Sequence, residues 1–248
     1  MRDVRQITIQ TGRGVELKGL LESPEHARGL IVFVHGSGSS RFSARNNRVA
    51  HFLRREGFAT LLMDLLTASE DQIDAITREL RFDVPMLAER VAGTLEWLLQ
   101  RKDVGHLPIG LFGASTGAAA ALIAAAAQPS RVLAVVSRGG RPDLAHENLA
   151  SVDTPTLLIV GSEDVQVLEL NRLAMSQIPG KTQLVIVPGA THLFEEPGTL
   201  DKVARYAADW FRLHLHEKTH ESQQPSRGPA PPMSSSAEAT RTLDSPQR

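Results

Sequence analysis

Short apolar runs separated by longer amphipathic segments make up most of this chain. The first two segments, residues 5–10 and 15–22, alternate in polarity around the turn sequence TGRG, which is the pattern of a β-hairpin. The later runs are almost wholly apolar, as is typical of strands covered on both faces. They lie at residues 30–34, 59–64, 107–112, 131–136, 156–160 and 183–187, so the pattern predicts eight strands.

Helical patterns fill most of the intervals between these strands. Residues 84–100 are amphipathic, with leucine and valine on one face. Further helices are predicted at residues 44–56, 118–127, 143–149, 168–178 and 200–213, whereas residues 65–81 are polar and predict a loop with a helical turn. A hairpin followed by alternating strands and helices predicts an α/β fold, with a mostly parallel eight-stranded sheet and helices on both faces.

The segment GASTG at residues 113–117 stands between a strand-like run and an alanine-rich segment that favours a helix. A G-x-S-x-G pattern in that context is typical of a nucleophile elbow, in which strained backbone holds the serine hydroxyl above the sheet. Glycine on either side of Ser115 avoids the collision that a Cβ atom would make with a neighbouring element. Ser115 is therefore a candidate nucleophile. The alternative is that it is only a small residue in a tight turn.

Composition narrows the class of protein. The 248 residues, 42% of them hydrophobic, suffice for one large α/β domain or two small ones, and the net charge of −1 gives no indication of a nucleic-acid partner. The chain has no cysteine, which excludes disulfides, thiolate catalysis and cysteine-ligated zinc and is compatible with the cytoplasm. No secretory signal or membrane-spanning stretch is visible, so we expect a cytoplasmic protein without a membrane partner.

Residues 217–248 differ in composition from the rest of the chain. They are rich in Ser, Pro, Gln, Thr and Arg, and they have almost no large apolar residues. Such a segment cannot bury enough apolar surface to offset the entropy lost on ordering. The sequence thus predicts one domain over residues 1–216 and a disordered C-terminal tail over residues 217–248.

A serine hydroxyl becomes a good nucleophile only when a base removes its proton and a carboxylate orients that base. Asp164 follows the predicted strand 156–160, and His192 follows the last strand, so the order Ser, Asp, His is the one expected on this architecture. Both residues come after the carboxyl end of a strand, where open α/β sheets build their sites. Glu163 is the alternative carboxylate, and Asp164 could instead cap the next helix. His35 closes an early strand, and we expect it to shape the loop that follows.

A negative charge that develops on a substrate oxygen needs two convergent backbone N–H donors. Thr116, the residue after the candidate nucleophile, is expected to supply one from the start of its helix. The loop after the third strand is expected to supply the other, from Ser37 or, as second choice, Gly38. This loop could instead be merely flexible or a glycine-rich phosphate cradle, although neither the GxxxxGK[ST] nor the GxGxxG pattern occurs in the chain.

Together, the elbow at residues 113–117, His35 with Gly36, Asp164 in the pattern G-x-x-D and His192 resemble the α/β-hydrolase superfamily over roughly residues 4–215. Within it, the chain is similar to the small dienelactone-hydrolase-like esterases. The resemblance implies a serine hydrolase with no metal and no organic cofactor. Dienelactone hydrolase itself uses cysteine where position 115 is serine, so its particular substrate is not carried over.

The expected activity is hydrolysis of carboxylic esters through an acyl-enzyme. Only about 19 residues separate Ser137 from the next strand, too few for a large lid, so we expect small or exposed small-molecule esters as substrates. The same triad would also serve an acyltransferase, a thioesterase or a peptidase, and an inactive hydrolase fold would be a binding module. The oligomeric state stays open, with a homodimer as one option.

Arginines surround the expected site. Arg138 and Arg141 follow the predicted strand 131–136, and Arg41 and Arg45 lie near the expected oxyanion donor. An arginine fork binds a carboxylate through two hydrogen bonds, and dienelactone hydrolases accept anionic substrates. Arg138 and Arg141 are therefore candidate substrate-binding residues. The alternative, which we prefer at this stage, is that they pair with nearby acidic residues, Asp143 or Glu147, and only fix the loop.

Overall fold

The computed structural model describes residues 4–12 and 14–215. The domain predicted for residues 1–216 falls largely within this part, whereas the tail predicted for residues 217–248 lies outside the described residues. In the described part, no helix is long and apolar enough to cross a membrane. The cytoplasmic location and the homodimer stay predictions.

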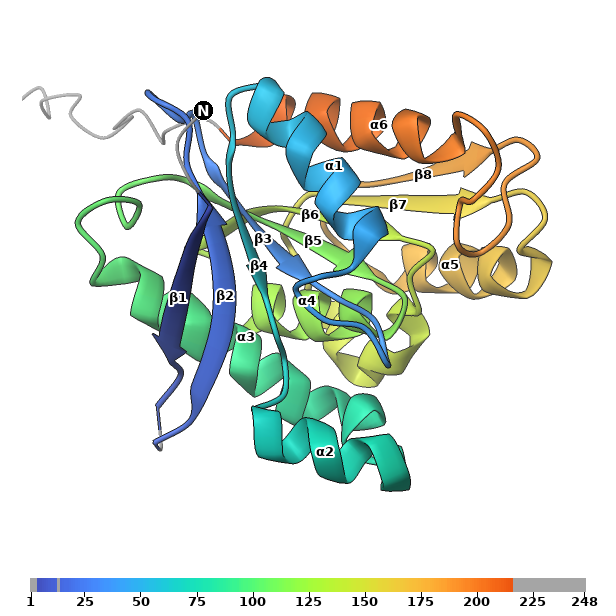
Figure 1. The fold of residues 1–248 in the computed structure, drawn as a ribbon. Coiled ribbons are helices and arrows are strands. Elements are labelled where there is room, and N and C mark those ends of the chain that lie inside the picture. Colours follow the sequence, from blue (N-terminus) through green and yellow to red (C-terminus); the bar gives the residue numbers. More distant parts are fainter. Residues whose placement is uncertain (1–3, 13, 216–248) are drawn as a thin grey trace, which may run out of the picture. The chain divides into compact units, whose positions relative to one another are not determined.

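A central sheet organises the fold (Figure 1). Its strands are β1 (Arg5–Gln10), β2 (Glu16–Glu22), β3 (Leu30–Val34), β4 (Ala59–Met63), β5 (Ile109–Ala114), β6 (Val132–Arg138), β7 (Thr156–Gly161) and β8 (Thr182–Val187). They are ordered β1-β2-β4-β3-β5-β6-β7-β8, and only the pairs β1–β2 and β2–β4 are antiparallel. The prediction of a mostly parallel eight-stranded sheet is confirmed.

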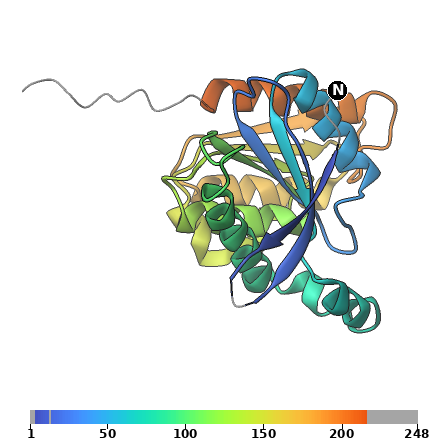
Figure 2. The same ribbon diagram turned by 60° about the vertical axis from the view of Figure 1, so that its left-hand side comes forward.

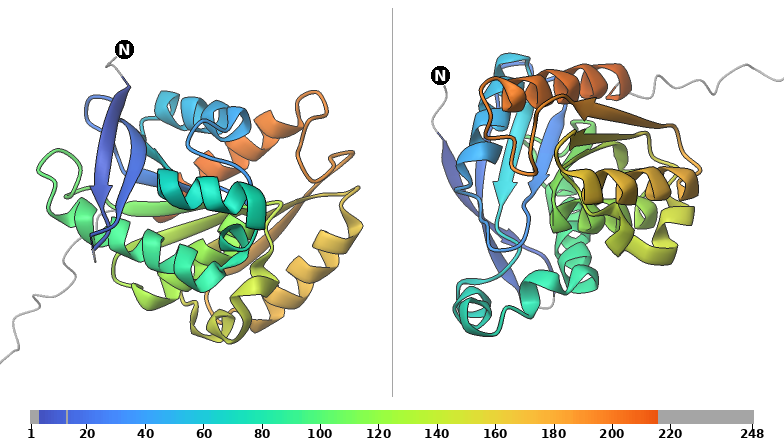
Figure 3. Two further views of the ribbon diagram at one scale, coloured as in Figure 1. Left: turned by 60° about the horizontal axis from the view of Figure 1, so that its bottom comes forward. Right: turned by 90° about the vertical axis from the view of Figure 1, so that its right-hand side faces the viewer.

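Helices cover both faces of this sheet (Figures 1 and 3). They are α1 (Ala44–Arg55), α2 (Ala68–Thr77), α3 (Val84–Leu99), α4 (Thr116–Ala127), α5 (Val165–Gln177) and α6 (Thr199–His214), with the 3₁₀-helices η1 (Leu80–Phe82) and η2 (Pro142–Ser151). α1 and α6 pack on one face around aromatic side chains, including Phe33, Phe112 and Phe211. α3, α4 and α5 lie on the other face, where the alanines of α4 let that helix approach the strands closely.

Helix α2 is the main difference from the predicted elements. The sequence predicts a loop with one helical turn there, but Ala68–Thr77 form a helix of 10 residues. Thr67 and Glu70 cap its start reciprocally, because each side chain accepts the backbone N–H of the other residue. Asp74 is the buried residue of this helix, so no apolar stripe predicts it. Figure 2 shows α2 standing apart from the layered elements beyond the end of β4.

The ends of two elements near the site also differ from the prediction. β6 runs two residues further, because Ser137 and Arg138 pair with both neighbouring strands. Arg138 is therefore the last residue of a strand and not part of a loop. The connection from β6 to β7 holds only the 10-residue η2, which leaves no room for a large lid. α5 begins at Val165, directly after Asp164.

Candidate active site

Ser115 occupies the sharp turn between β5 and α4. Its backbone has φ 51° and ψ −125°, a conformation that residues other than glycine rarely adopt. A Cβ atom at Gly117 would lie 2.3 Å from the carbonyl oxygen of Val34, and one at Gly113 would lie 2.5 Å from the Cα of Ala118. Glycine at both positions lets β3, β5 and α4 meet around the serine, which is the geometry of a nucleophile elbow.

Backbone hydrogen bonds tie this elbow to the end of β6. The N–H of Ser115 donates to the carbonyl of Arg138 across 3.3 Å, and the N–H of Arg141 donates to the carbonyl of Ser115 across 3.0 Å. Ser115 is thereby held at the carboxyl edge of the parallel strands, where ligands of open α/β sheets bind.

The candidate base and its carboxylate are in contact. Nδ1 of His192, in the loop after β8, lies 2.6 Å from Oδ2 of Asp164, in the turn after β7. The side chain of Asp164 makes no capping hydrogen bond to α5, so the capping alternative does not describe it. Glu163, the other carboxylate considered, is exposed and accepts a hydrogen bond from the hydroxyl of Ser162. Among the described residues, Asp164 is the carboxylate that contacts His192.

A carboxylate that the sequence analysis did not single out holds the His192 loop. Glu196 accepts hydrogen bonds from the backbone N–H and the hydroxyl of Thr191, across 3.1 and 2.6 Å. The hydrogen bond from the hydroxyl lowers the pKa of Glu196 below its ordinary value. The only sequence signal for this pair is a threonine followed five residues later by glutamate in a loop, which is too common to predict a contact.

Ser115 and His192 both contact the end of β6. A Cβ atom at Gly139, which has φ 51°, would lie 3.6 Å from Cε1 of His192. The carbonyl oxygen of the preceding residue, Arg138, accepts the N–H of Ser115. No hydrogen bond joins Ser115 Oγ to His192 in the part of the chain that the structure describes. Such bonds are often long before substrate binds, so the arrangement is compatible with a triad.

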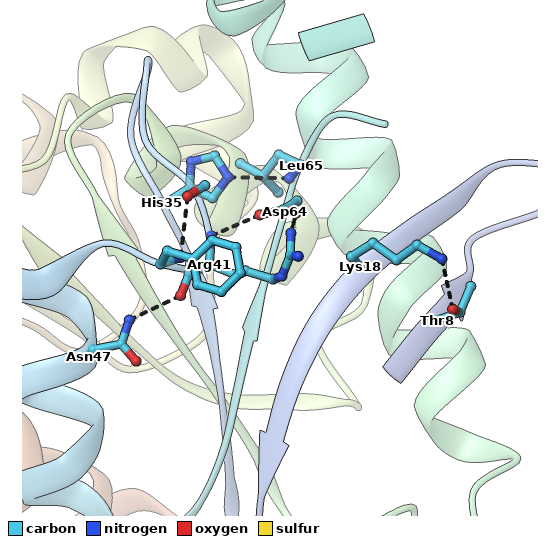
Figure 4. A network of polar contacts seen from close by, with 9 residues as sticks. Thr8, Lys18, His35, Arg41, Asn47, Asp64 and Leu65 are labelled. Atoms are coloured by element: carbon cyan, nitrogen blue, oxygen red, sulfur yellow. Dashed lines mark hydrogen bonds and ion pairs between the residues drawn. The ribbon is translucent and has the colours of Figure 1, made fainter. Parts of the chain in front are cut away.

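His35 joins the loops that follow β3 and β4 (Figure 4). Its Nδ1 lies 2.9 Å from the carbonyl oxygen of Gly36, and its Nε2 lies 3.2 Å from the backbone N–H of Leu65. Since a carbonyl can only accept and an N–H can only donate, the ring proton is on Nδ1. Burial lowers the pKa of His35, which keeps the ring neutral. His35 thus shapes the loop that carries Ser37.

Ser37 and Thr116, the two expected oxyanion donors, are brought together. The N–H of Ser37 donates to Oγ1 of Thr116 across 2.9 Å. Thr116 is the first residue of α4, so its own N–H has no partner within the helix. The β3 loop and the start of α4 therefore meet beside Ser115, with the Ser37 N–H engaged by the Thr116 side chain.

Three of the four arginines near the site pair with carboxylates. These pairs are Arg41 with Asp64, Arg45 with Glu195 and Arg141 with Asp143. Arg141 makes two parallel bonds, of 2.9 and 2.8 Å, to the carboxylate. The pair with Asp143 agrees with the alternative in which Arg141 fixes the loop and does not bind substrate.

Arg138 differs from these three. It is only 6% exposed, its Nη2 donates to Oδ1 of Asn46 across 3.3 Å, and its guanidinium lies 5.9 Å from the ring centre of Phe194. Its Nε has no hydrogen-bond partner, and no carboxylate within residues 4–12 and 14–215 forms an ion pair with it. Burial, and then the nearby charge of Arg45, lower its pKa to about 10, so Arg138 stays charged at neutral pH.

A cavity of about 660 Å³ opens beside the Ser37 loop. Its walls come from residues 35–42, residues 64–69 and one side of α2. The cavity also reaches Lys18, whose Nζ donates a hydrogen bond to the hydroxyl of Thr8 (Figure 4). Ser115 is not among its lining residues, so the cavity adjoins the elbow through the β3 loop. In the described part of the chain, no group of three or more His, Asp or Glu side chains could hold a metal ion.

Comparison with known proteins shows the family of the chain. The model of the dienelactone hydrolase family matches residues 17–216. The chain belongs to the dienelactone hydrolase family. Two proteins of Mycobacterium tuberculosis, provisionally named phosphoribosyl transferases, are 58% identical over 213 residues, which cover 86% of this chain but 47% of each relative. The chain thus spans about half the length of these relatives.

Solved structures agree with the family assignment. A dienelactone hydrolase from Anabaena variabilis is 51% identical, with a TM-score of 0.85 over 86% of this chain and 99% of that one. Est1E from Butyrivibrio proteoclasticus, with a TM-score of 0.68 over 84% of this chain and 99% of its own, is 16% identical and so shows the fold alone. The chain is therefore a member of a hydrolase family with the α/β-hydrolase fold, as the sequence motifs predict.

Proposed function

We propose that the protein hydrolyses carboxylic esters through an acyl-enzyme, with Ser115 as nucleophile, His192 as general base and Asp164 as the residue that orients His192. The contact of 2.6 Å between His192 and Asp164, at the same sheet edge as the strained Ser115, is the observation that carries this proposal. A carboxylate on Nδ1 holds the imidazole in the tautomer whose Nε2 can accept a proton. Membership of a hydrolase family supports the reaction class.

In the first half of the reaction, Ser115 Oγ attacks the ester carbonyl carbon while its proton moves to Nε2 of His192. The carbonyl oxygen then carries the negative charge, next to the N–H of Thr116 at the positive end of α4. Collapse of this intermediate breaks the bond to the alcohol, which leaves with the proton from His192. A water molecule then repeats the sequence on the acyl-enzyme, so that the acid departs and Ser115 regains its proton.

The substrate that we propose carries an anionic group. Arg138 supports this, because a buried charge without an ionic partner is costly and an anion bound beside it would offset that cost. Its carbonyl accepts the N–H of Ser115, so Arg138 belongs to the strand end next to the nucleophile. The alternative is that Asn46 and Phe194 hold Arg138 in a purely structural role. Arg141 is the weaker candidate, since Asp143 already occupies its fork.

Other acyl acceptors are compatible with the same residues. An acyltransferase, a thioesterase or a peptidase would use the same first half-reaction, and an inactive fold would act as a binding module. The short β6–β7 connection favours a small or exposed ester. We do not extend the name phosphoribosyl transferase to this chain, because that activity can belong to the part of those relatives that the chain does not match.

Labelling with a fluorophosphonate tests the proposal, because the hydroxyl of an activated serine attacks its phosphorus, displaces fluoride and becomes phosphonylated. We expect one labelled peptide, containing Ser115, and loss of hydrolysis of p-nitrophenyl esters in step with labelling. A panel of p-nitrophenyl esters of rising chain length then gives the acyl preference. Ser176→Ala is the control, because Ser176 is exposed on α5 and its hydroxyl bonds only the carbonyl of Leu173. An unlabelled protein, or a label on another serine, would contradict the assignment of Ser115.

A further inference from the structure

The side chain of Thr116 stands where the β3 loop meets the elbow. The N–H of Ser37 points at Oγ1 of Thr116 across 2.9 Å. A backbone N–H has a single proton, so this bond competes with any direct bond from Ser37 to a substrate oxygen. In this structure the N–H of Ser37 is therefore not free to be the second oxyanion donor.

The Thr116 hydroxyl itself has a proton to give. A hydroxyl oxygen that accepts one hydrogen bond can still donate its own proton, and no group among the described residues accepts that proton. Thr116 is 4% exposed, so water competes little for the proton. Hydrogen bonds in such a buried setting are stronger than in water, and an accepted bond polarises the O–H that donates the next.

We propose that the hydroxyl of Thr116 is a second donor to the oxyanion, in addition to the backbone N–H of the same residue. Ser37 is then a positioning residue, whose N–H fixes the orientation of the hydroxyl and polarises it. Both donors sit on the first residue of α4, directly after the nucleophile, where the helix dipole also favours negative charge. This inference rests on the proposed function, because it requires an oxyanion to form at Ser115.

Three variants separate this role from a merely structural one. Thr116→Val replaces the hydroxyl by a methyl group of similar size, and Thr116→Ala removes both the hydroxyl and the methyl group. Thr116→Ser keeps the hydroxyl and removes only the methyl group. We expect the valine and alanine variants to lose about 10²-fold in kcat with little change in KM, since an oxyanion donor acts in the transition state. Thr116→Ser should retain most of the activity. Thermal unfolding of each variant reports whether the elbow still folds.

The relative rates of hydrolysis of an ester and its matched thionoester, which differ in one atom, provide a second measurement. A purely structural role of Thr116 would leave this ratio unchanged. Sulfur in a thionoester accepts hydrogen bonds more weakly than the oxygen of the matched ester. The unaltered protein should therefore prefer the oxygen ester, and this preference should shrink in Thr116→Val and Thr116→Ala but not in Thr116→Ser. A lost donor costs the oxygen ester more than the thionoester.

Each contrary result overturns the inference. Full activity of Thr116→Val would mean that the hydroxyl gives nothing to the transition state, and increased activity would mean that it obstructs the oxyanion. An unchanged preference between ester and thionoester in the hydroxyl-free variants would leave Thr116 a structural residue. If the fluorophosphonate still labels Ser115 in these cases, the proposed function stands and only this inference fails. If the unaltered protein is not labelled, both fail.

Discussion

The carboxylate of Asp164 lies 2.6 Å from Nδ1 of His192, although the two residues are 28 positions apart in the chain. The turn after β7 and the loop after β8 meet because these two strands are adjacent and parallel. A carboxylate accepts a hydrogen bond only, so this contact fixes the proton on Nδ1 and leaves Nε2 free to act as base. The neighbouring Glu163 points to solvent and makes no such contact in the described part.

Substitution of Asp164 should therefore be far more damaging than substitution of Glu163. We expect Asp164→Asn to lower kcat by about 10⁴-fold, because an amide permits the wrong imidazole tautomer. Glu163→Gln is the matched control, with the same change of charge one residue away, and should be mild. Steady-state hydrolysis of a p-nitrophenyl ester measures both. Greater damage from Glu163→Gln would transfer the role to that residue.

Loss of the Arg138 charge should affect an anionic substrate selectively. With a matched pair of esters, one neutral and one bearing a carboxylate, we expect Arg138→Gln to raise the KM of the anionic ester by about tenfold or more, as loss of a charge-assisted bond does. The neutral ester should change much less. Arg48→Gln is the control, because Arg48 of α1 forms an exposed ion pair with Asp201 of α6. An equal effect of Arg138→Gln on both esters would make Arg138 structural, and the proposed substrate charge would be withdrawn.

His35 should make the stability of the fold sensitive to acid. Burial lowers the pKa of His35 below 6.5, so the unfolded chain takes up a proton at a higher pH than the folded one. The contribution of His35 to stability is therefore complete above pH about 6.5 and is lost as the pH falls below that value. Protonation of Nε2 would also remove the bond from the Leu65 N–H and loosen the loop that holds Ser37.

Urea unfolding at several pH values tests this. We expect the difference in unfolding free energy between the unaltered protein and His35→Gln to shrink as the pH falls from 7.5 to about 5. The exposed His106 gives the control, since His106→Gln makes the same substitution on the surface and the effect of His35→Gln is compared with it. A difference that stayed constant, or grew, for His35→Gln would show that His35 is not buried in its neutral form.

The sequence predicts those parts of the fold that bury apolar residues. The six apolar runs all became strands, and the G-x-S-x-G segment gave the strained Ser115 because glycines on both sides permit the close approach of β3 and α4. Hydrophobic pattern does not predict helix α2, because this helix buries no apolar face; a capping box at Thr67 and Glu70 marks its start instead. A capping box before a polar segment is the signal that would have predicted it.

Side-chain partners at the site could not be predicted in the same way. The bond from Ser37 to Thr116 joins residues 79 positions apart and depends on how closely two loops approach. Arg138 and Arg141 look alike in the sequence, but the strand continues to Arg138 and buries its side chain, whereas Arg141 lies in the following turn and reaches Asp143. The sequence does not reveal that a strand continues through polar residues such as Ser137, because a strand is recognised in a sequence by its hydrophobic pattern.

The turnover of Ser115→Ala is the most direct test of the central claim, that this chain is a serine hydrolase. Alanine fits the space of serine, so circular dichroism and the melting temperature should be nearly unchanged. The account predicts a loss of about 10⁴ to 10⁶ in kcat on a p-nitrophenyl ester, together with loss of fluorophosphonate labelling. Residual activity within about tenfold of the unaltered protein, in a preparation free of contaminating esterase, would contradict it.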